Sequence, residues 1–581
     1  MMTSSSTSPE DRASSSTARR RRGLAVVLFF LALTVVFSWP LPARMTTHLL
    51  ARDPDIDLLM WALGWNAHAF LHQPFALFDA NIFYPAKYAL AYSENMIGSA
   101  ILTAPLIWLT GDLLLTMNVV QLSSVFLSAL GAYLLGRRLG LGVPAALLTG
   151  IVFGFAPARF FRMPQAHLTT IQWLPFCLAY LHTYFGPGGR ARDLRLAVFF
   201  FTAQALTSGH GAVFLTVAVL LYLGYRLGRG ERPDIRRRIG DLGIPGALLL
   251  LPSVLIIGPY RAARLEAPSL ARGLDDFGSS VSSYLSTPAH VHQWLLSLMP
   301  DWIRTVPPDA HLFPGVLPIV LALVAVAAAI LSRGGPAIHT RASSARPDQP
   351  IVIYGAIAVV SAWFTLGPPL GLWRWTYWMP VFNFLRVPSR FVLLEMLALA
   401  VLSGFGYQWL VRHATPARQR QAAAAIGLLL LVEFAPLPMG TVPYSVEPPA
   451  VDRWLASQPT PFVVAEIPLP MTSMAGTRAR RDARFMLHST AHWQKTIHGY
   501  SGAEPPGYAE LSLAMMFFPD ERSLEAMADM GVTHVVVHPD LYPDDERDAA
   551  MARIDAGSDW LRPAYYGRDG RVYRLVRPPI E

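Results

Sequence analysis

The sequence predicts a polytopic α-helical membrane protein with about eleven transmembrane helices, additional interfacial or re-entrant helices and a small C-terminal α/β domain. Three observations predict this fold class. The 581 residues are 53% hydrophobic and only 15% charged, and the mean hydropathy of +0.35 is too high for a soluble chain of this length. Apolar runs separated by arginine clusters recur from residue 24 to residue 440. After Gly440 charged residues become frequent.

The composition also excludes some partners and sites. The formal net charge is +9, but the arginines lie mostly between apolar runs, which is typical of cytoplasmic loops and not of a nucleic-acid-binding surface. We therefore expect no nucleic acid partner. The single cysteine, Cys177, lies in an apolar segment, so the sequence offers no internal disulfide and no cysteine-based metal site.

The N-terminal segment, residues 1–23, is rich in Ser and Thr, and we expect it to be a disordered cytoplasmic tail. It ends with the arginines 19–22, directly before the first apolar run, Leu24–Pro42. By the positive-inside rule these arginines hold the N-terminus in the cytoplasm. A cleavable signal peptide has the same layout, but the small-residue cleavage site is missing and more spans follow. The run is therefore interpreted as an anchored first helix of a transmembrane domain at 24–440.

The first outer loop, residues 44–97, contains two acidic residues of interest, Asp55 and Asp57. Side chains at i and i+2 diverge in a helix and in a strand, so one carboxylate can face a substrate while the other faces solvent or a metal. A carboxylate near an apolar wall can accept a proton from an attacking hydroxyl and act as a general base. The alternative is a polar N-cap before a helix that starts near Leu58, and the charge pattern alone favours it.

Apolar length and arginine placement define the remaining spans. A short run at 98–109 is broken by Pro105, and we expect it to be re-entrant or interfacial, because a full crossing would place the arginine clusters on the outer side. Full spans are expected at residues 113–136, 142–157, 168–186, 195–208, 211–228, 243–260, 312–332, 350–368, 391–411 and 421–440.

The last segment, residues 441–581, is expected to form an extracytoplasmic α/β domain, since an odd number of spans from a cytoplasmic N-terminus ends outside. Strand-like runs occur at 461–468 and 533–537, a helical pattern at 544–554 and a closing strand at 571–576.

Two basic segments lie on outer turns in this topology, against the positive-inside rule. The first is the turn at 155–167 and the second is the segment at 384–391. An anionic group such as a phosphate would compensate their charge, because guanidinium groups bind phosphate bidentately. Snorkelling to lipid headgroups is the alternative. The residues concerned are Arg159, Arg162, His167, Arg386 and Arg390.

Two further segments carry polar side chains on the outer side. His210 lies on a tight turn and is interpreted mainly as part of a helix cap. In the last domain, the stretch around His498–Gly502 combines aromatic, polar and glycine residues. Aromatic rings beside hydrogen-bonding groups suit a sugar face, although the same mixture also forms ordinary packed loops.

A series of short segments stands out across the chain: Asp55 with Trp61 and Trp65, Asn81–Pro85, Tyr92–Glu94, Phe155–Arg159, His167, Gln172–Pro175, Arg386–Phe391 and His498–Gly502. Together they resemble bacterial membrane proteins of the GT-C glycosyltransferase superfamily, and the similarity covers most of the chain. The nearest resemblance is to the branch of YfhO-like proteins that carry a C-terminal extracytoplasmic domain.

The resemblance implies an inverting hexosyl- or pentosyltransferase in the bacterial inner (plasma) membrane. Such an enzyme takes a sugar from a polyprenyl-phosphate donor on the outer side and passes it to a glycan, lipid or protein acceptor of the cell envelope. By position, Asp55 matches the acidic residue of the family and is the expected general base, with Asp57 the weaker candidate.

The resemblance also implies binding roles. The donor phosphate would contact the basic residues Arg159, Arg162, His167, Arg386 and Arg390. The sugar or the acceptor would contact Trp61, Glu94, His498 and Tyr500. This sequence lacks the paired Asp-Glu that many members carry in the first loop, which leaves open whether Asp57 replaces the second acid and whether a divalent metal, Mg²⁺ or Mn²⁺, assists.

The alternative from a different class is a non-catalytic membrane protein, such as a lipid-linked sugar flippase or an envelope assembly scaffold. A transporter is expected to place charged side chains inside its spans near the middle of the bilayer. Here the strong charges gather at one outer face, and Glu395 and Glu433 are the main exceptions.

Overall fold

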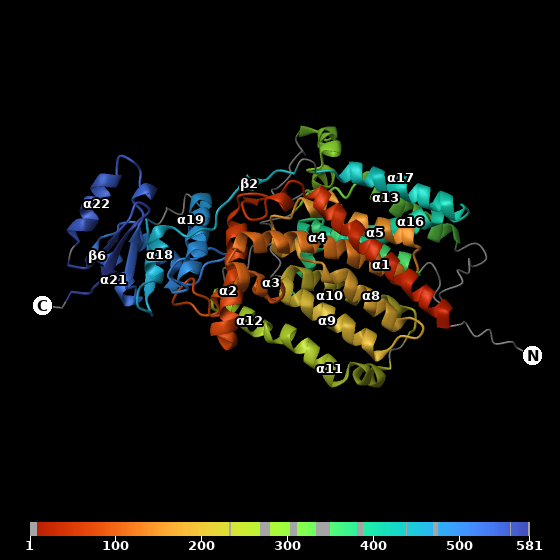
Figure 1. Cartoon of the computed structure of the whole chain (residues 1–581), viewed down its shortest axis with the longest axis horizontal. Coiled ribbons are helices and arrows are strands. Elements are labelled where there is room, and N and C mark those ends of the chain that lie inside the picture. Colours follow the sequence, from red (N-terminus) through yellow and green to blue (C-terminus); the bar gives the residue numbers. More distant parts are fainter. Residues whose placement is uncertain are drawn as a thin grey trace, which may run out of the picture.

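The structure is a computed structural model. It describes residues 9–231, 234–267, 279–301, 311–332, 349–379, 387–436, 439–468, 475–557 and 559–578. The molecule is elongated, with a helical part at one end and a sheet flanked by helices at the other (Figure 1). The helix α2, Pro54–His72, stands between the two parts (Figure 1).

A helix lies at each of the eleven predicted spans. These helices are α1 Pro9–Phe37, α4 Leu113–Arg138, α5 Val143–Phe155, α8 Trp173–Phe185, α9 Ala191–Thr207, α10 Gly209–Gly228, α11 Ile235–Leu255, α13 Val316–Ser332, α14 Gln349–Thr365, α16 Val392–Leu410 and α17 Pro416–Phe434. In the described part of the chain, four helical segments are long and apolar enough to cross a membrane: Leu113–Arg138, Gly209–Gly228, Ile235–Glu266 and Pro388–Leu410.

The outer surface of the helical part suits a lipid environment. On α11, Ile244 is 78% exposed, Leu248 62% and Leu255 63%. A continuous apolar surface of this kind is unusual on a soluble monomer and typical of a helix that faces lipid. The fold and the apolar helices therefore support a membrane location.

Three helices differ from the expected boundaries. α1 begins at Pro9, so helix extends into the segment expected to be disordered, whose first eight residues lie outside the described part of the chain; a helix elongates readily once an adjoining turn has formed. α2 begins at Pro54 and not near Leu58. The short apolar run near 98–109 forms α3, Ile97–Thr110, which packs against α2 and α9.

Small residues allow close helix packing in the helical part. A Cβ atom at Gly406 in α16 would collide with the carbonyl oxygen of Leu321 in α13. A Cβ at Gly154 in α5 would lie 2.7 Å from the Cβ of Ala129 in α4. Glycine and alanine at such crossings are typical of helices that pack inside a membrane, where close van der Waals contact stabilises the pair.

The last part of the chain contains a five-stranded mixed sheet in the order β4-β3-β5-β7-β6. β3 pairs in parallel with β4 and β5, while β7 is antiparallel to both β5 and β6. The strands are β3 Val463–Ile467, β4 Lys495–Thr496, β5 His534–Val537, β6 Leu561–Tyr566 and β7 Arg571–Leu575. The accompanying helices are α18 Ala450–Ala456, α19 Ala475–His488, α20 Tyr508–Met515, α21 Glu521–Asp529 and α22 Arg547–Ala556.

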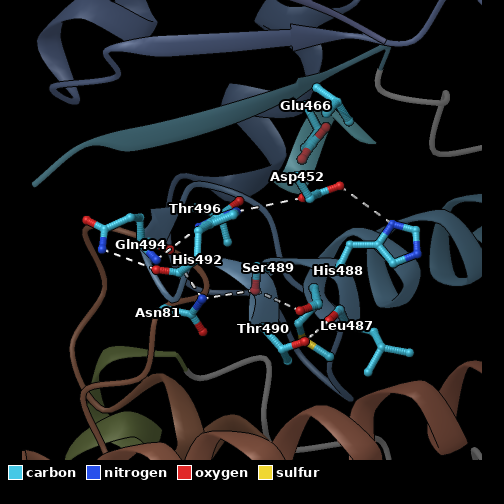
Figure 2. Close-up of polar contacts among 12 residues, drawn as sticks. Asn81, Asp452, Glu466, Leu487, His488, Ser489, Thr490, His492, Gln494 and Thr496 are labelled. Carbon is cyan, nitrogen blue, oxygen red and sulfur yellow. Dashed lines mark hydrogen bonds and ion pairs between the residues drawn. The ribbon is translucent and has the colours of Figure 1, made fainter. Parts of the chain in front are cut away.

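The first loop is attached to this sheet by hydrogen bonds. Asn81 donates from Nδ2 to Ser489 Oγ at 2.9 Å, and Figure 2 shows the Asn81 side chain reaching Ser489 from the first loop. The Thr496 N–H of β4 donates to the Asn81 carbonyl oxygen at 2.7 Å, and the Phe83 N–H donates to the His498 carbonyl oxygen at 2.9 Å. The loop therefore runs along the β4 edge of the sheet.

Two other contacts join the first loop and α2 to the last part of the chain. A two-residue strand, β1 His48–Leu49, pairs antiparallel with β2 Val442–Pro443. Leu59 of α2 and Val535 of β5 belong to one cluster of buried apolar side chains. The start of α2 is consequently held against the sheet part, and this contact positions the acidic residues of the first loop.

Candidate active site

The first turn of α2 positions Asp55 by local capping. Asp53 has an extended backbone and is the N-cap residue, and its carboxylate accepts a hydrogen bond from the Asp55 N–H at 2.8 Å. Pro54 follows as the first helical residue, where the missing N–H has no cost. The expected N-cap is thus present at Asp53, which leaves the half-buried carboxylate of Asp55 available for another contact.

That contact is made by the last part of the chain. The hydroxyl of Tyr500 donates to Asp55 Oδ1 at 2.8 Å. Tyr500 also lines a cavity of about 270 Å³. Asp55 and Tyr500, both predicted as site residues, are therefore hydrogen-bonded to each other, and Tyr500 joins Asp55 to this cavity.

Asp57 faces a different partner. It is 8% exposed, and its Oδ1 accepts a hydrogen bond from the hydroxyl of Tyr444. Arg484 Nη1 donates to the same hydroxyl at 2.6 Å. Burial raises the pKa of Asp57, although the Tyr444 hydrogen bond and the charge of Arg484 lower it in part. The two aspartates thus diverge as their i, i+2 spacing predicts, and Asp57 joins α2 to the segment before α18.

A second polar group lies around Glu94, which is 5% exposed. Its carboxylate accepts from the Gly209 N–H at 2.8 Å and the His210 N–H at 3.3 Å, at the start of α10. His210 Nδ1 also hydrogen-bonds Glu94 Oε1. Burial raises the pKa of Glu94, but His210, His167 and the Gly209 N–H together hold it below its ordinary value.

Arg390 completes this group from the helical segment that leads into α16. Its Nη1 lies 2.7 Å from His210 Nε2. Because a guanidinium only donates, Nε2 must accept, and the imidazole proton then sits on Nδ1 and points to Glu94. Glu94, His210 and Arg390 therefore form one chain of hydrogen bonds, buried at Glu94 and His210, with a defined histidine tautomer.

The first basic turn lies beside this chain. The ring of His167 is 5.9 Å from that of His210, centroid to centroid, and Ser208 Oγ donates to the His167 carbonyl oxygen at 2.6 Å. Arg162 Nη1 donates to the His311 carbonyl oxygen at 3.3 Å and to that of Ala158. The structure thus brings together His167, Glu94 and Arg390, three of the predicted residues, around His210.

Arg159 occupies a different environment from the one expected. It is fully buried, and its guanidinium donates to the Gly154 carbonyl at 3.0 Å, the Thr169 carbonyl at 2.9 Å and Ser128 Oγ at 2.8 Å. The turn folds inward, so protein oxygens solvate the charge. A donor phosphate cannot reach this guanidinium in the present conformation. Arg386 lies outside the described residues.

Trp61 and His498 are also closed off from a ligand. Trp61 is 1% exposed, and its indole N–H donates to Asn81 Oδ1 at 3.0 Å. His498 is 1% exposed, its Nε2 accepts from the Glu466 N–H at 2.6 Å, and burial lowers its pKa to about 3. Their contacts support the docking of the first loop and the sheet, and not a sugar face in this conformation.

The Asp55 and Glu94 groups are linked through the loop after β4. Ser501, next to Tyr500, donates from its hydroxyl to the Tyr92 carbonyl oxygen. Tyr92 lies two residues before Glu94 in the first loop. Sequence patterns missed His210 as a partner of Glu94, because the two residues are 116 positions apart; the flanking glycines of its turn were the only signal.

A metal site is not evident in the described ranges, where no group of three or more His, Cys, Asp or Glu side chains is arranged to hold an ion. Asp55 and Asp57 turn toward different tyrosines. The two aspartates therefore do not form the Mg²⁺ or Mn²⁺ site that the resemblance leaves open, and no chemical step is assigned to a metal.

No protein-family model matches the sequence, and no curated protein matches it. Among solved structures, the chain is similar to the arabinofuranosyltransferase AftD from Mycobacteria, with 16% identity and a TM-score of 0.56 over 96% of this chain. It spans only 40% of that protein's length. It is also similar to the oligosaccharyltransferase of Archaeoglobus fulgidus, with 12% identity and a TM-score of 0.50 over 96% of this chain and 75% of the other.

These similarities to solved structures establish the fold of the chain. The chain has the fold of GT-C membrane glycosyltransferases, as the resemblance predicts. The finer placement beside YfhO-like proteins stays a prediction.

Proposed function

We propose that the chain is a glycosyltransferase that moves a sugar from a polyprenyl-phosphate donor to a cell-envelope acceptor on the extracytoplasmic side of the bacterial inner membrane. The observation that carries the proposal is the hydrogen bond from Tyr500 to Asp55, which connects a half-buried carboxylate to a residue that lines a polar cavity in a GT-C fold. The transmembrane domain would comprise residues 24–440, with residues 441–581 as the extracytoplasmic domain.

Asp55 is the general base in this proposal. One oxygen accepts the hydrogen bond of Tyr500, which fixes the orientation of the carboxylate, and the other can take the proton of the acceptor hydroxyl. As that proton moves to Asp55, the acceptor oxygen forms a bond to the anomeric carbon of the sugar. The bond from that carbon to the phosphate oxygen breaks on the opposite side, its electron pair leaves with the polyprenyl phosphate, and the configuration inverts.

The leaving phosphate would be stabilised by the basic residues around His210. Arg162, His167 and Arg390 supply positive charge or donors there, and Arg386 belongs to the same basic segment as Arg390. Fixed donors aimed at a developing negative charge commonly account for most of the rate enhancement in such catalysis. Glu94 orients His210 and balances part of this charge, so it acts as a positioning residue here. Arg159 stabilises the first basic turn through its hydrogen bonds to Gly154, Ser128 and Thr169 and does not contact the phosphate.

The flippase or scaffold alternative gains no support from the acidic residues of the helical part. Glu395 accepts a hydrogen bond from the Tyr284 hydroxyl at 2.7 Å. Glu433 accepts from the Leu317 N–H at 3.2 Å at the start of α13 and lies 3.0 Å from His292 Nε2. Both carboxylates therefore have partners within the fold, and these contacts account for them as structural residues.

The proposal is tested with the full chain in lipid nanodiscs. Release of polyprenyl phosphate is measured from arabinosyl, mannosyl, glucosyl and galactosyl polyprenyl-phosphate donors in the presence of membrane glycolipid extract. Wild type should consume at least one donor, and Asp55→Asn should lower the rate at least a hundredfold. Asp548→Asn, on an exposed residue of α22, is the matched control and should behave as wild type. Equal rates for Asp55→Asn and wild type contradict the assignment of the base, and no consumption of any donor contradicts the enzyme.

A further inference from the structure

The cavity lined by Tyr500 carries further polar side chains that the transfer step leaves unused. It measures about 270 Å³, slightly below the usual range of small-molecule sites, which starts near roughly 300 Å³. That size suits one sugar ring and not a peptide segment. Its lining residues are Arg478, Ala479, Asp482, Gly499, Tyr500, Ser501 and Glu504.

An incompletely paired carboxyl group forms one wall of the cavity. Asp482 is 3% exposed, and its Oδ1 has no hydrogen-bond partner among the described residues. Its other oxygen, Oδ2, lies 3.4 Å from Arg478 Nε, one turn earlier on α19. A buried polar atom without a partner costs free energy. An oxygen left in this state on the wall of a cavity points to a ligand that donates a hydrogen bond to it.

The charge balance narrows the class of that ligand. Arg478 contacts Asp482 and also Glu504, whose Oε1 lies 3.1 Å from Arg478 Nη2. The guanidinium is therefore already paired with two carboxyl groups, which leaves little positive charge for an anionic ligand. Burial raises the pKa of Asp482 to about 7, although Arg478 lowers it in part, so this side chain can both accept and donate near neutral pH.

The remaining lining also suits hydroxyl groups. Tyr500 and Ser501 add hydroxyls, and Ala479 and Gly499 add only small non-polar surfaces. A peptide side chain would find little apolar area to bury here, whereas adjacent hydroxyls of a sugar match paired carboxyl and guanidinium groups.

We propose that this cavity binds one neutral sugar ring, the terminal residue of the acceptor glycan, through hydrogen bonds to Asp482 and Glu504. The inference rests on the proposed function and assigns the acceptor to a carbohydrate class. Tyr500 is shared between the cavity and Asp55, so a ring held against Asp482 presents a hydroxyl toward the base. Asp482 then determines acceptor specificity and takes no part in bond making.

Binding is measured separately from catalysis. The full chain in nanodiscs is titrated without donor, by saturation-transfer NMR, with methyl glycosides of arabinofuranose, galactofuranose, mannose, glucose and galactose. Methyl glucuronoside and a neutral tripeptide are the anionic and peptide probes. Asp482→Asn is the main variant. Glu504→Gln changes a side chain that is 45% exposed and avoids a folding defect, and Asp540→Asn on the exposed surface is the control.

At least one neutral glycoside should bind wild type, with Kd raised tenfold or more in Asp482→Asn, about threefold or more in Glu504→Gln, and unchanged in Asp540→Asn. The inference is overturned if no neutral glycoside binds, if the variants bind as wild type does, or if the glucuronoside or the tripeptide binds more tightly. Measuring donor consumption in the same nanodiscs separates the two proposals. Donor use with unaltered glycoside binding contradicts the acceptor site alone, whereas glycoside binding without donor use contradicts the transferase.

Discussion

The hydroxyl of Tyr500 donates a 2.8 Å hydrogen bond to Asp55 Oδ1 across 445 positions of sequence. The carboxylate that the sequence singles out in the first loop is thus completed by a side chain from the last part of the chain. Its neighbour Asp57 makes the equivalent contact with Tyr444. One turn of helix therefore holds two aspartates with two separate tyrosine partners and, as we propose, two separate roles.

Tyr500→Phe removes the donor to Asp55 and keeps the ring. A hydrogen bond to a charged acceptor contributes about 1.5–3 kcal/mol, so we expect kcat for sugar transfer to fall about ten- to a hundredfold, with the KM for the donor little changed. Tyr566→Phe, at a tyrosine that is 57% exposed, is the matched control. An unchanged kcat in Tyr500→Phe would show that the hydrogen bond does not orient the base.

Asp57→Asn should affect stability more than chemistry. The change weakens a buried hydrogen bond to Tyr444 and, through it, the contact with Arg484, a loss of about 1–3 kcal/mol. We expect a lower Tm and faster proteolysis near residue 444, with transfer reduced less than tenfold. Asp55→Asn should show the reverse pattern. If Asp57→Asn abolishes transfer while its Tm is normal, Asp57 is the base.

Arg390→Gln should weaken use of the donor. The substitution removes a charge from the proposed phosphate site and the donor to His210, and we expect the KM for the polyprenyl-phosphate sugar to rise about tenfold or more. Arg390→Lys should recover part of this loss, because it restores the charge but not the planar fork of donors. Arg420→Gln, at an exposed arginine of α17, should leave the KM unchanged. A normal donor KM in Arg390→Gln would remove this residue from the phosphate site.

The sheet part should lose stability in mild acid. Burial lowers the pKa of His498 to about 3 and that of His488 to about 3, from an ordinary value of 6.5. The folded state therefore resists protonation, so this stability is present above pH 6.5 and is lost as the pH falls toward 3, by up to about 1.4 kcal/mol per pH unit for each histidine.

The Tm of wild type in nanodiscs should accordingly drop between pH 7 and pH 5.5, and the drop should be smaller in His498→Gln. Asp482 acts in the opposite direction, because its raised pKa favours the folded state at lower pH. The difference between variant and wild type isolates the histidine. Equal drops in both would show that His498 does not contribute.

Much of the fold follows from local patterns. Hydropathy and arginine placement predict a helix at each of the eleven spans, and β3, β5 and β7 lie within the segments expected to be strands. β6 was missed because Pro563 interrupts its pattern, and β4 because two residues, Lys495–Thr496, carry no strand signal. The extended backbone of β4 and β6 is imposed by hydrogen bonds to the strands beside them, β3 and β7, and not by the preferences of their own residues.

The candidate site could be predicted only in part, because its contacts are long-range. Asp55, Glu94, Tyr500, His167 and Arg390 follow from the family resemblance, and the structure gives each a polar environment. Arg159 was expected to need a phosphate, but the turn folds inward and carbonyl oxygens solvate it. Asp482 carries no signal in sequence, since its significance arises from one unpartnered oxygen beside a cavity.

The pairing of β1 with β2 joins residues near position 48 to residues near position 442. During synthesis, the first loop emerges long before its partner strand, its sheet and Tyr500 exist. The hydrogen bond between Asp55 and Tyr500 can therefore form only after almost the whole chain has been synthesised and inserted. In the proposed glycosyltransferase, activity should consequently appear only after Tyr500 has been synthesised and the last part of the chain has folded against the first loop.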